Sequence, residues 1–204
     1  VYATSGDRIL LWFDLINHNS GVIQPMGSEV DLENNPIFRV KAIGAQIQKP
    51  GCDLNTNAKV SEVISQLCKG ECFNPSDLRK IITSIEIVRI RPQSYSGEPI
   101  DPLIEDPWKT FDCEPSQEGC VVEFEDEQFL GSNREIVYYA RAIQEPSQAI
   151  NGNGFSCDMD ENGSCSSVNL CGNEKGQEEG DCLGELKERA WSSPIFVKVP
   201  KDPF

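Results

Sequence analysis

The chain has 204 residues with 33 acidic and 18 basic side chains, which gives a formal net charge of −15 at neutral pH. This surplus of negative charge argues against a general nucleic-acid binder and against docking on anionic membranes, because both need a basic face. No apolar run approaches the ~20 residues of a membrane-spanning helix, and a single histidine excludes a histidine-rich metal or catalytic site within this chain.

The N-terminal part predicts strands. Residues 8–16 form a short apolar run bounded by turn residues, which is typical of a buried strand. Residues 29–32 are also strand-like, and residues 36–43 alternate apolar and polar side chains as a half-buried strand does.

A change of period then predicts a helix. Val60, Val63, Ile64 and Leu67 follow the spacing of one helix face. Asn74–Asp77 predicts a turn, or the start of another short helical turn, after the helix. We therefore expect residues 52–80 to form a helical excursion from a sheet, held in place by its cysteines.

Strand patterns return in the second half of the chain. Residues 83–91 and 120–126 each predict a strand, and the proline-rich segment 92–115 between them predicts a long surface loop anchored by Trp108. Residues 135–144 form the strongest strand pattern of the chain, and residues 193–199 predict the last strand.

Several predicted strands with little helix favour an all-β fold. We predict one domain over residues 1–204, an antiparallel β-sandwich similar to fibronectin type III and immunoglobulin domains. Residues 146–189 are rich in Gly, Asn, Glu and Cys, and they predict an acidic, disulfide-rich insertion between the last two strands.

Nine cysteines lie in three local groups. No C-x-x-C pair occurs and the histidine is remote from every group, so disulfides are favoured over zinc. Disulfides persist outside the reducing cytosol, which predicts an extracellular or periplasmic protein. We expect the local pairs Cys113–Cys120, Cys157–Cys165 and Cys171–Cys182, and a fourth pair that joins Cys52 to Cys72 or Cys68.

An odd number of cysteines leaves one outside these pairs. We expect it in the group of Cys52, Cys68 and Cys72. It would be a free thiol, or it would bond to another chain or to a missing part of the polypeptide. A bond to another chain would allow the protein to self-assemble.

Residues 158–164 carry the Asp-x-Asp-x-Asn-Gly pattern of calcium loops. In one interpretation Asp158, Asp160 and Asn162 direct oxygens at one Ca²⁺ ion, although a full EF-hand loop needs a Glu where this chain has Asn169. The second interpretation is a hairpin without metal, because Asn-Gly favours positive φ in hairpin turns. We expect no other cofactor in this chain.

Eight segments, spread in order over nearly the whole chain, are similar in sequence to a known bacterial family. They are Val1–Ile9, Pro25–Glu29, Lys49–Cys52, Leu67–Cys72, Leu103–Trp108, Gly119–Asp126, Val137–Pro146 and Glu188–Val197. Together they resemble the family catalogued as domain of unknown function 3604. This resemblance implies a branch of the polymerase-and-histidinol-phosphatase superfamily, whose members are metal-dependent hydrolases.

In that superfamily the divalent metals are held by His, Asp and Glu in an N-terminal barrel. This chain resembles only the family's portion C-terminal to the barrel, and residues 1–20 are similar to the barrel's closing strand, so no metal ligand is carried over. Asp7 departs from the family, which more often carries Pro or Thr there. Its neighbour Arg8 would either approach a substrate anion or form a structural salt bridge.

These observations favour two functions. The first is a C-terminal β-rich accessory domain of a secreted or periplasmic metal-dependent hydrolase, non-catalytic by itself, that packs against the missing N-terminal catalytic portion. The second is an extracellular structural or assembly protein built on the same sandwich. Asp14 and His18 have no Ser or Cys nucleophile beside them, so the sequence contains no catalytic constellation.

Overall fold

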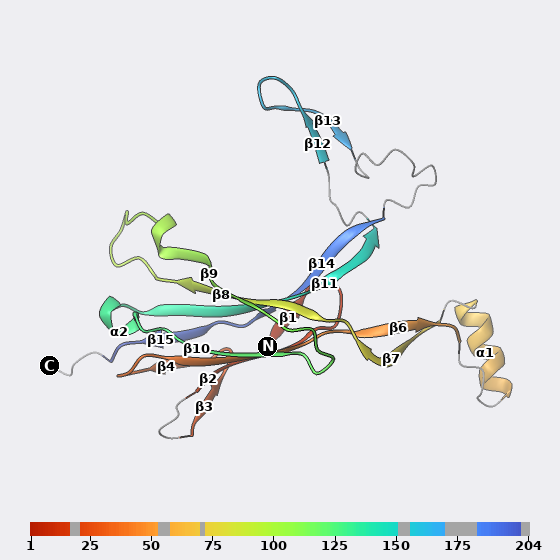
Figure 1. Ribbon diagram of the computed structural model, residues 1–204, viewed down its shortest axis with the longest axis horizontal. Coiled ribbons are helices and arrows are strands. Elements are labelled where there is room, and N and C mark those ends of the chain that lie inside the picture. The colour runs from red at the N-terminus through yellow and green to blue at the C-terminus, as the bar shows by residue number, and fades with distance from the viewer. Residues whose placement is uncertain (17–20, 53–57, 70–71, 151–155, 170–182, 201–204) are drawn as a thin grey trace.

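Two sheets stacked face to face form the body of the molecule (Figure 1). The structure is a computed structural model, and it describes residues 1–16, 21–52, 58–69, 72–150, 156–169 and 183–200.

The larger sheet has seven strands. They are β1 (Tyr2–Thr4), β4 (Glu29–Asp31), β8 (Ile82–Ile90), β9 (Ile104–Asp112), β11 (Ile136–Ile150), β14 (Leu183–Ser192) and β15 (Ile195–Lys198). The long strand β11 organises this sheet, because β8 pairs along one side of it while β14 and β15 share the other. The pairing is antiparallel except between β15 and β4.

The smaller sheet has four antiparallel strands in the order β10-β5-β2-β3. Their bounds are Leu10–Ile16 for β2, Ile23–Pro25 for β3, Ile37–Ile43 for β5 and Cys120–Glu125 for β10. Apolar and polar residues alternate along β2 and β5, so one face of each strand turns inward.

Aromatic rings from both sheets fill the space between them. The ring of Phe38 lies 5.3 Å from those of Phe13 and Phe124, and 4.6 Å from that of Tyr138 in the opposite sheet. Ile and Ala side chains of β8 and β11 complete the buried core. The predicted all-β antiparallel sandwich is therefore confirmed, whereas its likeness to fibronectin type III or immunoglobulin domains stays a prediction.

Two further strand pairs lie outside the sandwich. Strands β6 (Gln46–Pro50) and β7 (Phe73–Arg79) form a ribbon with helix α1 (Ala58–Cys68) at its tip, and β12 (Ser156–Met159) pairs with β13 (Cys165–Asn169) in a hairpin (Figure 1). The short helices are η1 (Asp101–Leu103) and α2 (Phe129–Ser132). No helix among the described residues is long and apolar enough to cross a membrane.

The loop predicted over residues 92–115 is partly wrong. Its second half is strand β9, which pairs only with β8 and is therefore an edge strand. Pro107 is tolerated there because an edge strand leaves one row of N–H groups unpaired, and the register shifts at that point. Trp108 does anchor the segment, since it packs against the core.

The turn predicted at Asn74–Asp77 is also wrong, because these residues belong to β7. The segment 52–80 thus contains strand β7 as well as helix α1. The ends of the predicted insertion 146–189 belong to the main sheet, where Ile150 pairs with Leu183. Residues 2–4, for which the family resemblance implies a barrel's closing strand, pair with β14 of this domain's own sheet.

Candidate functional site

The predicted calcium loop is the turn of the β12–β13 hairpin. One carboxylate oxygen of Asp160 accepts hydrogen bonds from the backbone N–H groups of Asn162 and Ser164, at 2.9 and 2.8 Å. Gly163 has the positive φ of +77° that the Asn-Gly pair favours. The side chain of Asp158 lies outside the described residues, so Asp160 and Asn162 alone of the three candidate ligands are placed.

Asp160 therefore has a structural role as the residue that caps its own turn. Within the described part of the chain, no three His, Cys, Asp or Glu side chains gather in an arrangement that holds a metal ion.

Two of the predicted disulfides have both partners among the described residues. Cys52 is bonded to Cys72 and Cys113 to Cys120, with Cα–Cα distances of 4.8 and 5.8 Å. Cys68 is unpaired. Cys165 is also disulfide-bonded, while the side chain of Cys157 and all of Cys171 and Cys182 lie outside the described residues. These bonds are consistent with an oxidising compartment.

Asp7 and Arg8 do not pair with each other. One carboxylate oxygen of Asp7 accepts hydrogen bonds from the ammonium of Lys80 and the amide of Gln144, each at 2.6 Å. Among the described residues, Arg8 forms no salt bridge. Asp14 lies on β2 across from Arg39. Burial raises its pKa, which the charge of Arg39 partly offsets, and His18 lies outside the described residues.

The ribbon β6–β7 carries α1 away from the sandwich as a projecting arm, which comprises residues 46–50, 58–68 and 73–79 (Figure 1). The disulfide Cys52–Cys72 and a hydrogen bond from the Asn74 amide to the Gly51 carbonyl (2.7 Å) close the arm below the helix. At its base, Gly44 passes so close to β7 that a Cβ would lie 1.8 Å from the Lys80 carbonyl oxygen. Only glycine fits there.

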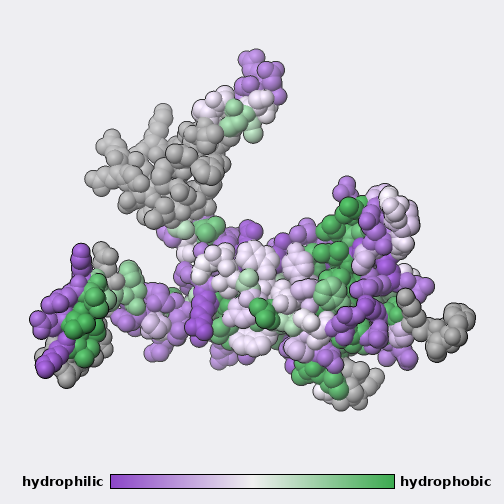
Figure 2. Space-filling view, turned by 180° about the vertical axis from the view of Figure 1, so that it is seen from behind, coloured by the Kyte–Doolittle hydropathy of each residue, from purple (hydrophilic) through white to green (hydrophobic). Residues whose placement is uncertain are grey.

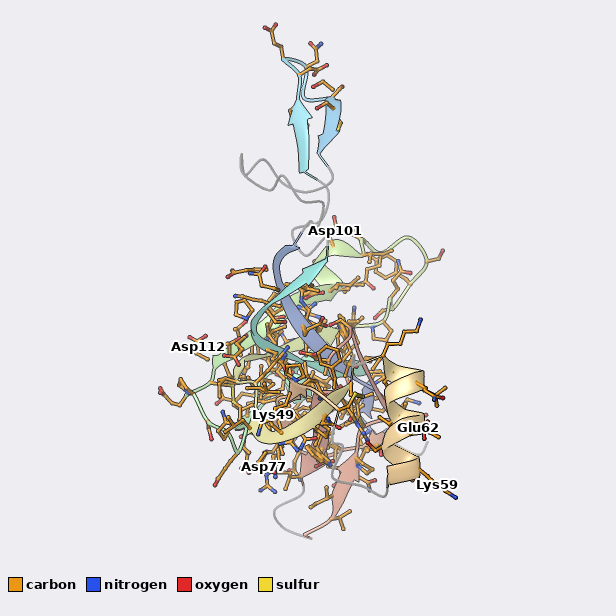
Figure 3. The ribbon with its side chains drawn as sticks, turned by 90° about the vertical axis from the view of Figure 1, so that its right-hand side faces the viewer. Lys49, Lys59, Glu62, Asp77, Asp101 and Asp112 are labelled. Carbon is orange, nitrogen blue, oxygen red and sulfur yellow. A yellow bond between two sulfur atoms is a disulfide. The ribbon has the colours of Figure 1, made fainter. Side chains whose placement is uncertain are left out.

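One face of α1 is apolar and uncovered. Val63 is 52% exposed and Leu67 78%, and Val60 lies on the same stripe. Figure 2 shows this stripe running along the helix at the tip of the arm. Lys59 and Glu62 project outward from the helix in Figure 3. Their positions lie off the apolar stripe at the spacing of a helix, so the helix is amphipathic.

An eleven-residue helix is marginal in water by itself, and most helices owe their stability to an apolar face that packs against other residues. Here α1 makes only sparse contacts with the other described elements. The exposed stripe is therefore a candidate binding surface, because a partner that covered it would supply the missing packing.

A buried charge cluster lies at the other end of the sandwich. Arg89 on β8 is 2% exposed, and its guanidinium donates to both oxygens of the fully buried Asp126 at 3.0 and 2.9 Å. It also donates to Glu105 on β9, at 2.6 and 3.0 Å. The hydroxyl of Tyr138 donates to Asp126 at 2.6 Å, and the guanidinium of Arg89 lies 4.2 Å from the centre of the Trp108 ring.

The cluster shifts the pKa values of two of its members, Arg89 and Tyr138. Burial by itself would lower the pKa of Arg89, but hydrogen bonds to Glu105 and Asp126 and their negative charges raise it. Burial, together with the smaller effects of the hydrogen bond to Asp126 and its charge, raises the pKa of Tyr138 well above its ordinary value. A charged Arg, a neutral Tyr and a paired carboxylate form a structural network.

Sequence reasoning identified the α1 periodicity but missed both the uncovered state of its apolar face and the buried cluster. Nothing local marks the cluster, since Asp126 lies 37 residues from Arg89. Comparison with protein-family models, curated proteins and solved structures finds no match to this chain.

Proposed function

We propose that this chain is a non-catalytic accessory domain of a larger exported protein, and that the projecting arm contacts the catalytic portion of that protein. The observation that carries the proposal is the amphipathic helix α1, whose Val63 and Leu67 side chains are exposed. An amphipathic helix that lays its apolar face into a groove is a recurrent mode of protein recognition.

The arm suits such a contact because a disulfide holds the helix where it leaves the ribbon. The Cys52–Cys72 bond closes a loop with a sequence separation of 20, which limits the conformations that α1 must give up on binding. The family resemblance supports a metal-dependent hydrolase as the parent, in an extracellular or periplasmic setting where these disulfides persist.

Intact-mass analysis of the native polypeptide tests the first half of this proposal. We expect a mass well above the 22.7 kDa of this chain, because the proposal requires a catalytic portion in the same polypeptide. A native mass near 22.7 kDa would remove the hydrolase assignment and leave a protein that acts by itself.

Hydrogen exchange tests the second half. We expect residues 58–68 to be protected in the native polypeptide and to exchange fast in the isolated 204-residue chain. Val63→Ser and Leu67→Ser together should abolish that protection. Glu62→Gln, on the polar side of the same helix (Figure 3), is the matched control and should preserve it. Equal exchange in both forms would contradict the contact.

The unpaired Cys68 on α1 favours a second function, an extracellular structural or assembly protein. In this alternative the apolar stripe contacts a second copy, and an oxidant such as glutathione disulfide accepts the electrons as two Cys68 thiols form one bond. Non-reducing electrophoresis should then show a dimer that Cys68→Ser abolishes. A monomer under oxidising conditions would exclude this alternative.

A further inference from the structure

A cleft of about 570 Å³ opens where the N-terminal segment meets the base of the projecting arm. Asp7, Arg8 and Leu10 line one side of it, and Ala45, Pro75 and Arg79 line the other. Its volume lies within the range of ~300–1,000 Å³ that is typical of small-molecule sites.

The walls of the cleft are held together by one buried side chain. The amide of Gln144, which is 0% exposed, accepts a hydrogen bond from the backbone N–H of Ala45 at 2.9 Å and donates to Asp7 at 2.6 Å. The ammonium of Lys80 donates to the same Asp7 oxygen. These contacts fix both sides and neutralise the carboxylate that lines the cleft.

Two arginines, Arg8 and Arg79, also line the cleft. Arg79 uses one nitrogen to donate to the Gly44 carbonyl at 2.9 Å. Arg8 is exposed and has neither a hydrogen bond nor an ion pair with any described residue. A guanidinium carries five N–H donors in a planar fork that matches a carboxylate or phosphate. Most of the N–H donors of these two side chains therefore have no partner among the described residues.

We infer that this cleft binds a small organic carboxylate, whose oxygens accept hydrogen bonds from Arg8 and Arg79. The lining explains why the anion is organic. Leu10, Ala45 and Pro75 offer apolar contact for a short hydrocarbon part, which inorganic phosphate would leave unused. The site is independent of the α1 stripe and of the proposed accessory role, since it involves none of the α1 residues.

Titration of the 204-residue chain with butyrate, followed by amide NMR at constant ionic strength, tests the inference. We expect saturable shifts at the backbone amides of Gly6, Ala45 and Gln46. Butyramide has the same shape without the charge and should cause none. Arg8→Gln should weaken butyrate binding about tenfold, since hydrogen bonds to a charged group are lost.

Lys41→Gln is the matched control, because it removes a positive charge from the exposed face of β5 and should leave binding unchanged. Arg8 has no partner among the described residues, so the spectrum of Arg8→Gln should otherwise match that of the wild type. Equal shifts with butyramide, or equal affinity in Arg8→Gln, would overturn the site. Saturation by inorganic phosphate without saturation by butyrate would overturn the assignment of an organic carboxylate as the ligand.

Discussion

Arg89–Asp126 and Arg39–Glu123 are ion pairs with similar N–O distances, 2.9 and 2.6 Å, but the first is buried and the second is exposed. The Arg89–Asp126 pair has side chains 3% and 0% exposed, whereas both side chains of the Arg39–Glu123 pair are 43% exposed. A buried charge that loses its partner has neither water nor a counter-ion, while an exposed one is resolvated. The two pairs should therefore respond differently to truncation.

We expect Asp126→Ala to lower the free energy of unfolding by about 3–5 kcal/mol, because it leaves Arg89 buried with fewer partners. Glu123→Ala, the matched control, should cost less than about 1 kcal/mol. Urea unfolding monitored by tryptophan fluorescence measures both values. Similar losses in the two variants would show that the buried pair contributes no more to the free energy of unfolding than the exposed pair does.

Alkaline pH should lower the stability of the folded protein through Tyr138. Its pKa is raised in the folded protein, chiefly by burial and then by Asp126, above the 10.0 of a free tyrosine. The folded state thus favours the neutral phenol. This contribution to stability is complete below pH 10 and is lost as the pH rises further, because the unfolded chain ionises first.

Tyr138→Phe should therefore lose less stability than the wild type between pH 9 and 11, in urea titrations at each pH. The exposed Tyr95 supplies the control variant Tyr95→Phe, which should behave as the wild type does. If all three proteins lost stability in parallel, ionisation elsewhere in the chain would govern the alkaline limit.

At the scale of elements, the pattern of apolar residues predicted those strands and the helix that depend mainly on local sequence. An apolar run identified β2, alternation identified β5 and β11, and the helical spacing from Val60 to Leu67 identified α1. Strands β7 and β9 were missed because turn residues and prolines outweigh strand propensity in a short window. Both strands exist because a neighbour, β6 or β8, supplies their hydrogen bonds.

The candidate sites were likewise predicted only in part, because the sequence indicates single residues but not how the fold places them. The apolar stripe of α1 is visible in the sequence, but its exposure depends on where the ribbon carries the helix. Likewise, Arg8 was recognised as a possible anion contact, whereas its companion Arg79 comes from a strand that the sequence did not predict.

The β12–β13 hairpin permits a test of its turn. Asp160→Ala removes the acceptor for the N–H groups of Asn162 and Ser164, so amide exchange at residues 160–165 should quicken. Asp160→Asn keeps a side-chain oxygen and should behave nearly as the wild type. Because the carboxylate serves the turn, we expect millimolar Ca²⁺ to leave exchange in the wild type unchanged. Slower exchange on adding Ca²⁺ would favour the calcium loop.

At the scale of the whole molecule, the sandwich is built from contacts between distant parts of the chain. Strand β1 near the N-terminus pairs with β14, and the core joins Phe38 to Tyr138 across the two sheets. By contrast, the projecting arm and the β12–β13 hairpin pair only within themselves. The large core and the local appendages should therefore unfold separately.

The disulfides are distributed unequally between these parts. Cys52–Cys72 closes the arm, and Cys165 at the start of β13 is disulfide-bonded. Cys113–Cys120 joins the end of β9 to the start of β10 and so links the two sheets, but its sequence separation is only 7. A loop this short contributes about 2 kcal/mol, which the buried core of the sandwich can lose without unfolding.

Reduction should thus release the appendages and spare the sandwich. In hydrogen exchange with and without reductant, we expect residues 73–79 of β7 and residues 156–169 to lose protection while residues 136–143 of β11 keep theirs. Cys52→Ser combined with Cys72→Ser should reproduce the loss at residues 73–79 alone, without reductant, and so assign it to the arm's own bond. Loss of protection in β11 as fast as in the appendages would mean that the chain unfolds as one unit.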